Sequence, residues 1–261
     1  MRTPLSLSLC LSVCLGLAAT PAPAASPPFV RQSLANDAIL LVSEQRQLPI
    51  VDIEILLDAG SRRDPKGKEG LANLTADLLN EGTATRNASE LAEAVDRLGA
   101  SLSSSAGIDT ASIDLRVLRK DLDAGLALLA EVLLRPAFPA GELTRRREAV
   151  LAAMQAAEDQ PGWLAYRAFI GSVFGDEPYG HLVEGTPEAV AAITRRDVLE
   201  FYRRNYAPQR SIITVVGDVG TDEIAAKLNH ALATWSGSDA EAFAYPQVAA
   251  CLLYTSPSPR D

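Results

Sequence analysis

The stretch that decides the fold is Gly70 to Thr83, with the sequence GLANLTADLLNEGT. A glycine opens it, leucines return every three or four residues, and a Gly-Thr pair ends it, which predicts a packed amphipathic helix. The chain enters this helix from Val51 to Asp58, where Val, Ile and Leu alternate with mostly acidic residues. That two-residue period is typical of a strand with one buried face. The sequence therefore predicts a half-buried strand that leads through a short loop into a packed helix.

These residues resemble the inverted-motif zinc peptidases, the family of pitrilysin, insulin-degrading enzyme and the mitochondrial processing peptidase. The family helix resembles G-L-A-H-x-x-E-H-L-L-x-x-G-T and follows a strand that ends in a Gly-Ser turn. The matching positions here are Gly60, Ser61, Gly70, Leu71, Ala72, Leu78, Leu79, Gly82 and Thr83. The first His of the motif, however, falls on Asn73, its Glu on Ala76 and its second His on Asp77.

Each position of H-x-x-E-H has its own chemical role. Two imidazoles one helical turn apart bind one Zn²⁺, and the glutamate takes a proton from the metal-bound water. Ala76 cannot act as a base, and Asn73 offers only a neutral amide. Asp77 supplies one carboxylate where a catalytic zinc needs three protein ligands. A packed helix with two polar residues is therefore the favoured interpretation.

The third zinc ligand of the family is a glutamate on a later helix that resembles E-R-x-x-V-x-x-E. Matching that pattern around residues 147–151 places Ala153 at the ligand position. All four catalytic positions are thus lost together in an otherwise preserved frame. We expect this chain to have no catalytic residue, no bound metal and no cofactor, with zinc present only in a partner subunit.

Residues 1–24 predict a secretory signal peptide. They contain one positive residue, Arg2, then the apolar run Leu5 to Ala19, then the small residues Ala22-Pro23-Ala24 as a cleavage site. The run is too short to span a membrane. Residues 25–250 contain no cysteine, which suits an oxidising compartment. We expect a periplasmic or secreted protein.

The last residues, 251–261, read CLLYTSPSPRD and break sharply from the Ala-rich body of the chain. They resemble a translation of the transposase adaptor used to prepare sequencing libraries. We expect them to be a scar, with a natural irregular tail as the alternative. Residues 25–250 then form one N-terminal module, and we expect the natural protein to continue past Ala250 into a second module.

Hydrophobic periods and turn residues place further elements along the module. Strands are expected at 38–43, 50–57, 100–106, 110–118 and 212–218. Helices are expected at 87–98, 121–135, 142–158, 163–174 and 193–206, and a last helix is expected with Thr221 as its cap. The resemblance implies an α+β fold with helices packed on one face of a mainly antiparallel sheet.

Three polar features lie outside the helix motif. The run Arg145-Arg146-Arg147 predicts a solvated helix face, and a partner carboxylate is also conceivable there. His181 follows Pro178-Tyr179-Gly180 in a loop that matches the family, but no second histidine is close to it in sequence. His230 is expected to be a surface residue near a helix end. Neither histidine is assigned a role.

The resemblance implies a non-catalytic subunit of a periplasmic, heterodimeric zinc peptidase, which helps to bind and enclose unfolded peptides. Its partner would keep H-x-x-E-H, and substrate-binding Arg and Tyr residues would lie in the second module. A non-proteolytic scaffold, like the core subunits of the respiratory bc1 complex, is the alternative. An active enzyme with substitute ligands would need a base near Asp77, which the sequence does not offer. The formal net charge of −9 argues against nucleic-acid binding, and no membrane span is expected.

Overall fold

The computed structural model describes residues 28–237 and 242–245. The signal-peptide and adaptor interpretations, which concern residues 1–24 and 251–261, lie outside these residues. Within the described ranges, no helix is long and apolar enough to cross a membrane.

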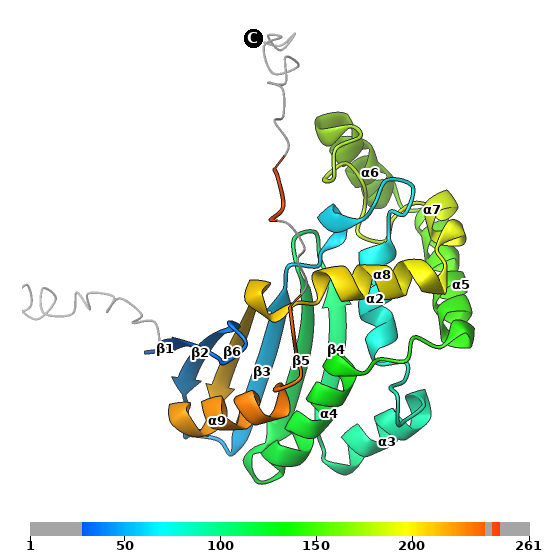
Figure 1. The fold of residues 1–261 in the computed structure, drawn as a ribbon. Coiled ribbons are helices and arrows are strands. Elements are labelled where there is room, and N and C mark those ends of the chain that lie inside the picture. Colours follow the sequence, from blue (N-terminus) through cyan, green and yellow to red (C-terminus); the bar gives the residue numbers. More distant parts are fainter. Residues whose placement is uncertain (1–27, 238–241, 246–261) are drawn as a thin grey trace, which may run out of the picture.

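The centre of the fold is a six-stranded sheet with the strand order β1-β2-β6-β3-β5-β4 (Figure 1). Its strands are β1 (Val30–Ser33), β2 (Ile39–Glu44), β3 (Ile50–Leu57), β4 (Ser101–Ala106), β5 (Ala111–Leu118) and β6 (Ser211–Gly217). Every neighbouring pair is antiparallel except β2 and β6, which run parallel. The expected mainly antiparallel sheet is confirmed.

Among the described residues, four helices pack on one face of this sheet: α2 (Leu71–Leu79), α3 (Ala88–Arg97), α4 (Leu122–Leu134) and α9 (Thr221–Ala231) (Figure 1). Helices α5 (Ala140–Ala157) and α8 (Arg195–Asn205) pack on α2, and α7 (Pro187–Ala192) packs on α5. Helix α6 (Pro161–Phe174) projects away from the sheet (Figure 1). On β3, Val51 and Ile53 face the helices and are at most 2% exposed, while Asp52 and Glu54 are half-exposed on the other face. The predicted α+β fold with a one-sided core is therefore confirmed.

The structure adds two elements that were not predicted and corrects one expectation. Strand β1 was not predicted, because its residues are mostly exposed and form a strand only by pairing with β2. Helix α7 was not predicted either, because it is only six residues long. The expected cap of α9 is wrong: Gly220 holds the cap position, and Glu44 of β2 accepts the N–H of Thr221 at 2.9 Å and its hydroxyl at 3.1 Å.

Two glycines lock a distant loop onto the start of α2. Gly70 has a φ of 98°, and a Cβ there would lie 2.4 Å from the carbonyl oxygen of Glu184. Gly185 has a φ of 89°, and its Cβ would lie 2.0 Å from the carbonyl oxygen of Glu69. Only residues without a side chain allow the two backbones to approach this closely. The two motifs that each carry one of these glycines thus form a single packing contact.

Candidate degenerate active site

The four positions that the sequence resemblance assigns to the family's catalytic residues lie on two helices that pack together, α2 and α5. Asn73 and Asp77 are one helical turn apart on α2 and are both half-buried. Ala76 is fully buried, whereas Ala153 of α5 is exposed. These side chains supply one amide, one carboxylate and two methyl groups, a set that does not fit a catalytic zinc ion. In the part of the chain that the structure describes, no three His, Cys, Asp or Glu side chains gather into a metal-binding group.

Asp77 is the one ionisable group among the four positions. Its burial raises its pKa, the nearby charge of Arg146 opposes this, and the charge of Glu81 adds to it. The hydroxyl of Tyr206 is buried without a hydrogen-bond partner, and its own burial and the charge of Asp77 both raise its pKa. This arrangement supplies one carboxylate that can accept hydrogen bonds, in place of the two imidazoles and the glutamate of the family motif.

Glu81, just after α2, fastens that helix to α5. Its carboxylate is 7% exposed, and it contacts Arg145 Nη2 at 2.5 Å and Arg146 Nε at 2.8 Å. Burial would raise the pKa of Glu81, but the two arginines outweigh burial and lower it. The third arginine of the run, Arg147, donates to the carbonyl of Ile193 at 3.2 Å. The prediction of a purely solvated face is therefore incomplete. Arg145 and Arg146 share the carboxylate of Glu81, which is the kind of partner that the sequence left open.

Replacing this carboxylate, Glu81→Gln, should lower the free energy of unfolding by about 1–3 kcal/mol, a value reduced for the partial exposure of both arginines. The variant leaves two guanidinium groups beside a neutral amide. Urea unfolding measures the change. The control is Glu93→Gln, which removes a pair with Arg97 whose side chains are both about 70% exposed and should leave stability unchanged. Equal effects of the two substitutions would contradict a fastening role for Glu81.

Asp64 serves as the missing cap of α2. Gly70 at the cap position has no side chain, and the backbone N–H groups of Gly70 and Ala72 instead donate to the Asp64 carboxylate, both at 2.7 Å. Burial raises the pKa of Asp64 to about 7, although the N–H groups of Ala72 and Gly70 favour its charged form. The start of the helix therefore depends on a carboxylate that is costly to ionise.

This raised pKa predicts a pH dependence of stability with a definite sign. Because the folded pKa of Asp64 exceeds its ordinary value of 3.8, the folded chain binds the proton more tightly than the unfolded chain between these pH values. The contribution of Asp64 to stability should fall as pH rises toward 7. The amide introduced by Asp64→Asn does not titrate, so the free energy of unfolding of this variant, measured relative to the wild type, should rise by a few kcal/mol as pH increases from about 4 to about 8. Each pKa unit of difference between the folded and unfolded chain corresponds to about 1.4 kcal/mol. Parallel stability curves for the two proteins in urea titrations would refute this.

Strand β4 forms an open edge of the sheet beside α2. Within the described residues it pairs only with β5, so its outer backbone groups have no strand partner. Ser104 Oγ donates to the carbonyl of Ala76 at 2.6 Å and accepts from Asn80 Nδ2 at 2.8 Å, which fixes β4 to the helix. The sequence predicted this strand but not its position next to the degenerate motif. The two-residue hydrophobic period indicates that a strand forms, but it does not indicate which strands become neighbours in the sheet.

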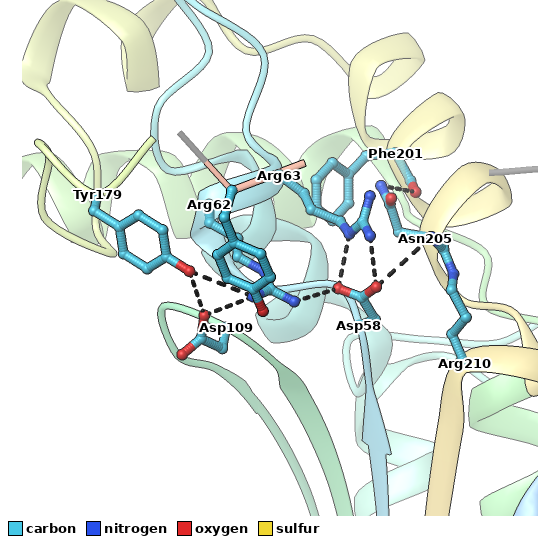
Figure 2. A network of polar contacts seen from close by, with 9 residues as sticks. Asp58, Arg62, Arg63, Asp109, Tyr179, Phe201, Asn205 and Arg210 are labelled. Atoms are coloured by element: carbon cyan, nitrogen blue, oxygen red, sulfur yellow. Dashed lines mark hydrogen bonds and ion pairs between the residues drawn. The ribbon is translucent and has the colours of Figure 1, made fainter. Parts of the chain in front are cut away.

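A second polar centre surrounds Arg62, in the 3-10 turn η2 (Ser61–Arg63) that follows β3 (Figure 2). Arg62 Nη2 donates to Asp58 Oδ1 at 2.9 Å, and Arg62 Nη1 donates to Asp109 Oδ1 at 2.9 Å. The hydroxyl of Tyr179 donates to the same Asp109 oxygen at 2.9 Å, and Arg63 Nε donates to Asp58 at 2.8 Å. Burial would raise the pKa of Asp58, but the hydrogen bonds from Arg63 and Arg62 lower it to about 2. The Gly-Ser turn and the Pro-Tyr-Gly loop, both quoted as motifs, therefore meet here.

The two histidines stand apart from both centres. His181 is half-buried, and its Nδ1 lies 2.8 Å from the carbonyl oxygen of Leu182. His230 is exposed in the last turn of α9, as expected from the sequence.

Comparison with known proteins agrees with this fold. The model of the insulinase family, peptidase family M16, matches residues 40–186. The model of the peptidase M16 inactive domain matches residues 192–258. Among solved structures, the peptidase M16 inactive domain from Pseudomonas fluorescens has a TM-score of 0.81 and 31% identity, over 85% of this chain and 54% of that one. The periplasmic protease PqqL from Escherichia coli shares the fold, with a TM-score of 0.76, 18% identity, and coverage of 85% and 25% of the two chains.

Curated relatives include an uncharacterized zinc protease from Rickettsia bellii, which is 28% identical over 75% of this chain and 48% of its own length. Another, from Mycobacterium leprae, is 31% identical over 67% of this chain and 39% of its own. Subunit 1 of the bovine mitochondrial cytochrome b-c1 complex is 25% identical over 74% and 40%. The chain thus spans half or less of the length of these relatives. Because the family model matches more than half of the residues of this chain, the chain belongs to the insulinase family, peptidase family M16.

Proposed function

We propose that this chain is the non-catalytic subunit of a periplasmic, two-subunit zinc peptidase, and that it helps to bind and enclose unfolded peptides. The observation that carries the proposal is the state of α2. The helix keeps its packing, its Asp64 cap and its Gly70–Gly185 contact, yet a buried methyl group, Ala76, stands where the family has its base. Such a helix can preserve the shape of the subunit, but it lacks the glutamate that would activate water.

The open edge of β4 supports a role in holding peptides. An extended peptide can add to an exposed sheet edge through main-chain hydrogen bonds, which requires no particular peptide sequence. The exposed serines Ser101, Ser103 and Ser105 leave this edge free of bulky side chains. The hydrogen bond from Ser104 to the carbonyl of Ala76 holds this edge beside the degenerate motif. A peptide bound there would be held without being cut by this chain.

Two of the similar proteins favour different candidate functions. The similar structure from Pseudomonas fluorescens is called an inactive domain of the family, which agrees with a subunit that lacks the catalytic residues. The bovine relative is a subunit of a respiratory complex and favours the second candidate, a scaffold that binds no peptide substrate. The two candidates differ in whether the chain changes the activity of a catalytic partner.

The expected result is that the purified chain holds no stoichiometric zinc and cleaves nothing alone, because Asn73, Asp77 and Ala153 do not provide three metal donors. Adding a family member with intact H-x-x-E-H should produce cleavage of an unstructured peptide. Metal analysis after dialysis against a weak chelator and a fluorogenic peptide assay measure the two parts.

The control mixture contains a partner whose motif glutamate is replaced by glutamine, and it should be inactive. One zinc ion per chain after dialysis, or chelator-sensitive cleavage by this chain alone, would overturn the non-catalytic assignment. A partner whose activity is unchanged by the chain would leave the scaffold as the better function.

A further inference from the structure

The guanidinium groups of Arg62 and Arg63 form a fixed platform. Asp58 holds both of them, and Asp109 and Tyr179 hold Arg62 from the other side (Figure 2). The Arg62 side chain is only 9% exposed. The residues that make these contacts, 58–63, 109 and 179, all lie outside the segment that rests on the platform. A preset surface of this kind loses little freedom when a ligand binds.

Residues 242–245 lie on this platform. The ring centroid of Phe243 is 4.7 Å from Arg62 Cζ and 5.6 Å from Arg63 Cζ, within the range of cation–π attraction. Two residues later, the Tyr245 ring lies 5.3 Å from Arg62 Cζ, and its hydroxyl accepts a hydrogen bond from Arg62 Nη1 at 2.9 Å. The rings of Phe243 and Tyr245 also meet edge to face at 5.3 Å. An aromatic pair spaced by one residue thus fits the two arginines.

Within the described residues, the segment is held by its side chains and remains partly open to solvent. No hydrogen bond joins its backbone to the rest of the described chain, and Tyr245 is 67% exposed. Phe243 also forms one wall of a cavity of about 550 Å³, whose other lining residues include Arg63, Lys68, Leu71, Phe201 and Arg204. A ligand that replaced Phe243 would therefore reach both the platform and this cavity.

We propose that the Arg62–Arg63 platform is a docking subsite for extended peptides that carry Phe-X-Tyr or a similar aromatic pair, and that Phe243-Ala244-Tyr245 occupies it as a competing internal segment. The ligand chemistry follows from the occupant: two aromatic faces for the guanidinium groups and one hydroxyl for Arg62 Nη1. The subsite rests on the proposed function only in taking peptides as ligands. It does not require zinc or a catalytic partner.

The experiment measures binding of a fluorescein-labelled peptide, Gly-Ala-Phe-Ala-Tyr-Gly, to the full chain by fluorescence anisotropy. The double variant Phe243→Ala/Tyr245→Ala vacates the platform and should bind the peptide at least tenfold more tightly than the wild type. A peptide with alanine in place of both aromatic residues should bind neither protein. Adding Arg62→Lys to the double variant keeps the charge but removes the planar fork, and it should abolish the gain.

The matched control is Tyr166→Ala/Phe169→Ala on α6, which removes two aromatic side chains that are 50% and 58% exposed and should bind the peptide as the wild type does. Circular dichroism checks that each variant is folded. Equal affinity of the wild type and the Phe243→Ala/Tyr245→Ala variant would overturn the subsite, as would equal binding of the aromatic-free peptide. Since no partner is present, failure here leaves the partner-dependent cleavage assay unaffected, and the reverse also holds.

Discussion

Zinc binding is expected to appear when Asn73→His, Ala76→Glu, Asp77→His and Ala153→Glu are introduced together. Residues 73 and 77 are one helical turn apart on α2, the spacing that two imidazoles need for one metal ion. Helix α5 packs against α2, and Ala153 is exposed, so a longer side chain there meets no core packing. Affinity should fall about 10- to 100-fold short of a natural site, because hydrogen-bond acceptors that orient metal-bound imidazoles were not selected here.

The four changes differ in what they demand of the fold. Ala76 is fully buried, so a glutamate there is expected to destabilise the metal-free variant through burial of a charge. Zinc should restore stability, since a ligand that binds only the folded state raises the apparent free energy of unfolding. Thermal melts with and without zinc, together with a competition titration against a zinc-binding dye, measure both effects.

A three-substitution variant that keeps Ala76 is the control. Position 76 corresponds to the base and not to a ligand, so this variant should bind zinc at least as well as the quadruple variant, with less loss of stability. Peptide cleavage by either variant should remain very weak without a partner that positions the substrate. A quadruple variant that is folded but binds no zinc at micromolar concentration would show that the alignment of these positions is wrong.

The second large effect is expected from Gly185→Ala, which should lower the free energy of unfolding by more than about 3 kcal/mol. The added Cβ would lie 2.0 Å from the carbonyl oxygen of Glu69, 2.3 Å from its carbonyl carbon and 2.6 Å from the N of Gly70. These are backbone atoms at the start of α2 and cannot turn aside as a side chain would. The loop around residue 185 must therefore separate from the helix. Urea unfolding and proteolysis of this loop measure the loss.

Gly67→Ala separates this clash from backbone strain. Gly67 has a φ of 78°, similar to the 89° of Gly185, but a Cβ there would meet no atom within 4 Å. Its substitution should cost only the left-handed backbone penalty of about 1–2 kcal/mol. Similar losses for the two variants would mean that the close approach of the Gly185 loop to α2 contributes nothing beyond strain.

Elements with a strong period could be predicted from the sequence to within a few residues. Strand β3 matches its predicted bounds, Ile50–Leu57, because its inner residues are all apolar and alternate with outer residues that include Asp52 and Glu54. Helix α3 begins at its predicted cap, Asn87, whose side chain and that of Glu90 form a capping box. Strand β1 could not be predicted, because the strand that stabilises it, β2, lies outside its own sequence. Helix α7 was missed because it is only six residues long, although Thr186 caps it by accepting from the N–H of Ala189. A hydrophobic or capping pattern therefore predicts an element only where the residues of that element determine its structure.

The candidate site follows the same division. Motif spacing identified Asn73, Ala76, Asp77 and Ala153 as corresponding positions, but it could not show that Ala76 is buried and Ala153 exposed. The platform around Arg62 was not predicted. Its partners Asp58, Asp109 and Tyr179 come from separate segments, and only the folded chain brings their side chains together. The quoted Gly-Ser and Pro-Tyr-Gly motifs were the available signal, since both of them flank this cluster.

The place of β6 in the sheet sets the order in which the molecule can assemble. Strands β2 and β3 are consecutive in the chain, yet β6, at Ser211–Gly217, lies between them and pairs with both. During synthesis, β3, β4 and β5 can pair early, with β5 between the other two, but β2 has no inner neighbour until residue 217 has left the ribosome. Contacts between such distant segments slow folding, and unpaired strand edges promote aggregation. Until β6 is made, the growing chain therefore has a gap in its central sheet, a state in which its unpaired strand edges are open to chaperones.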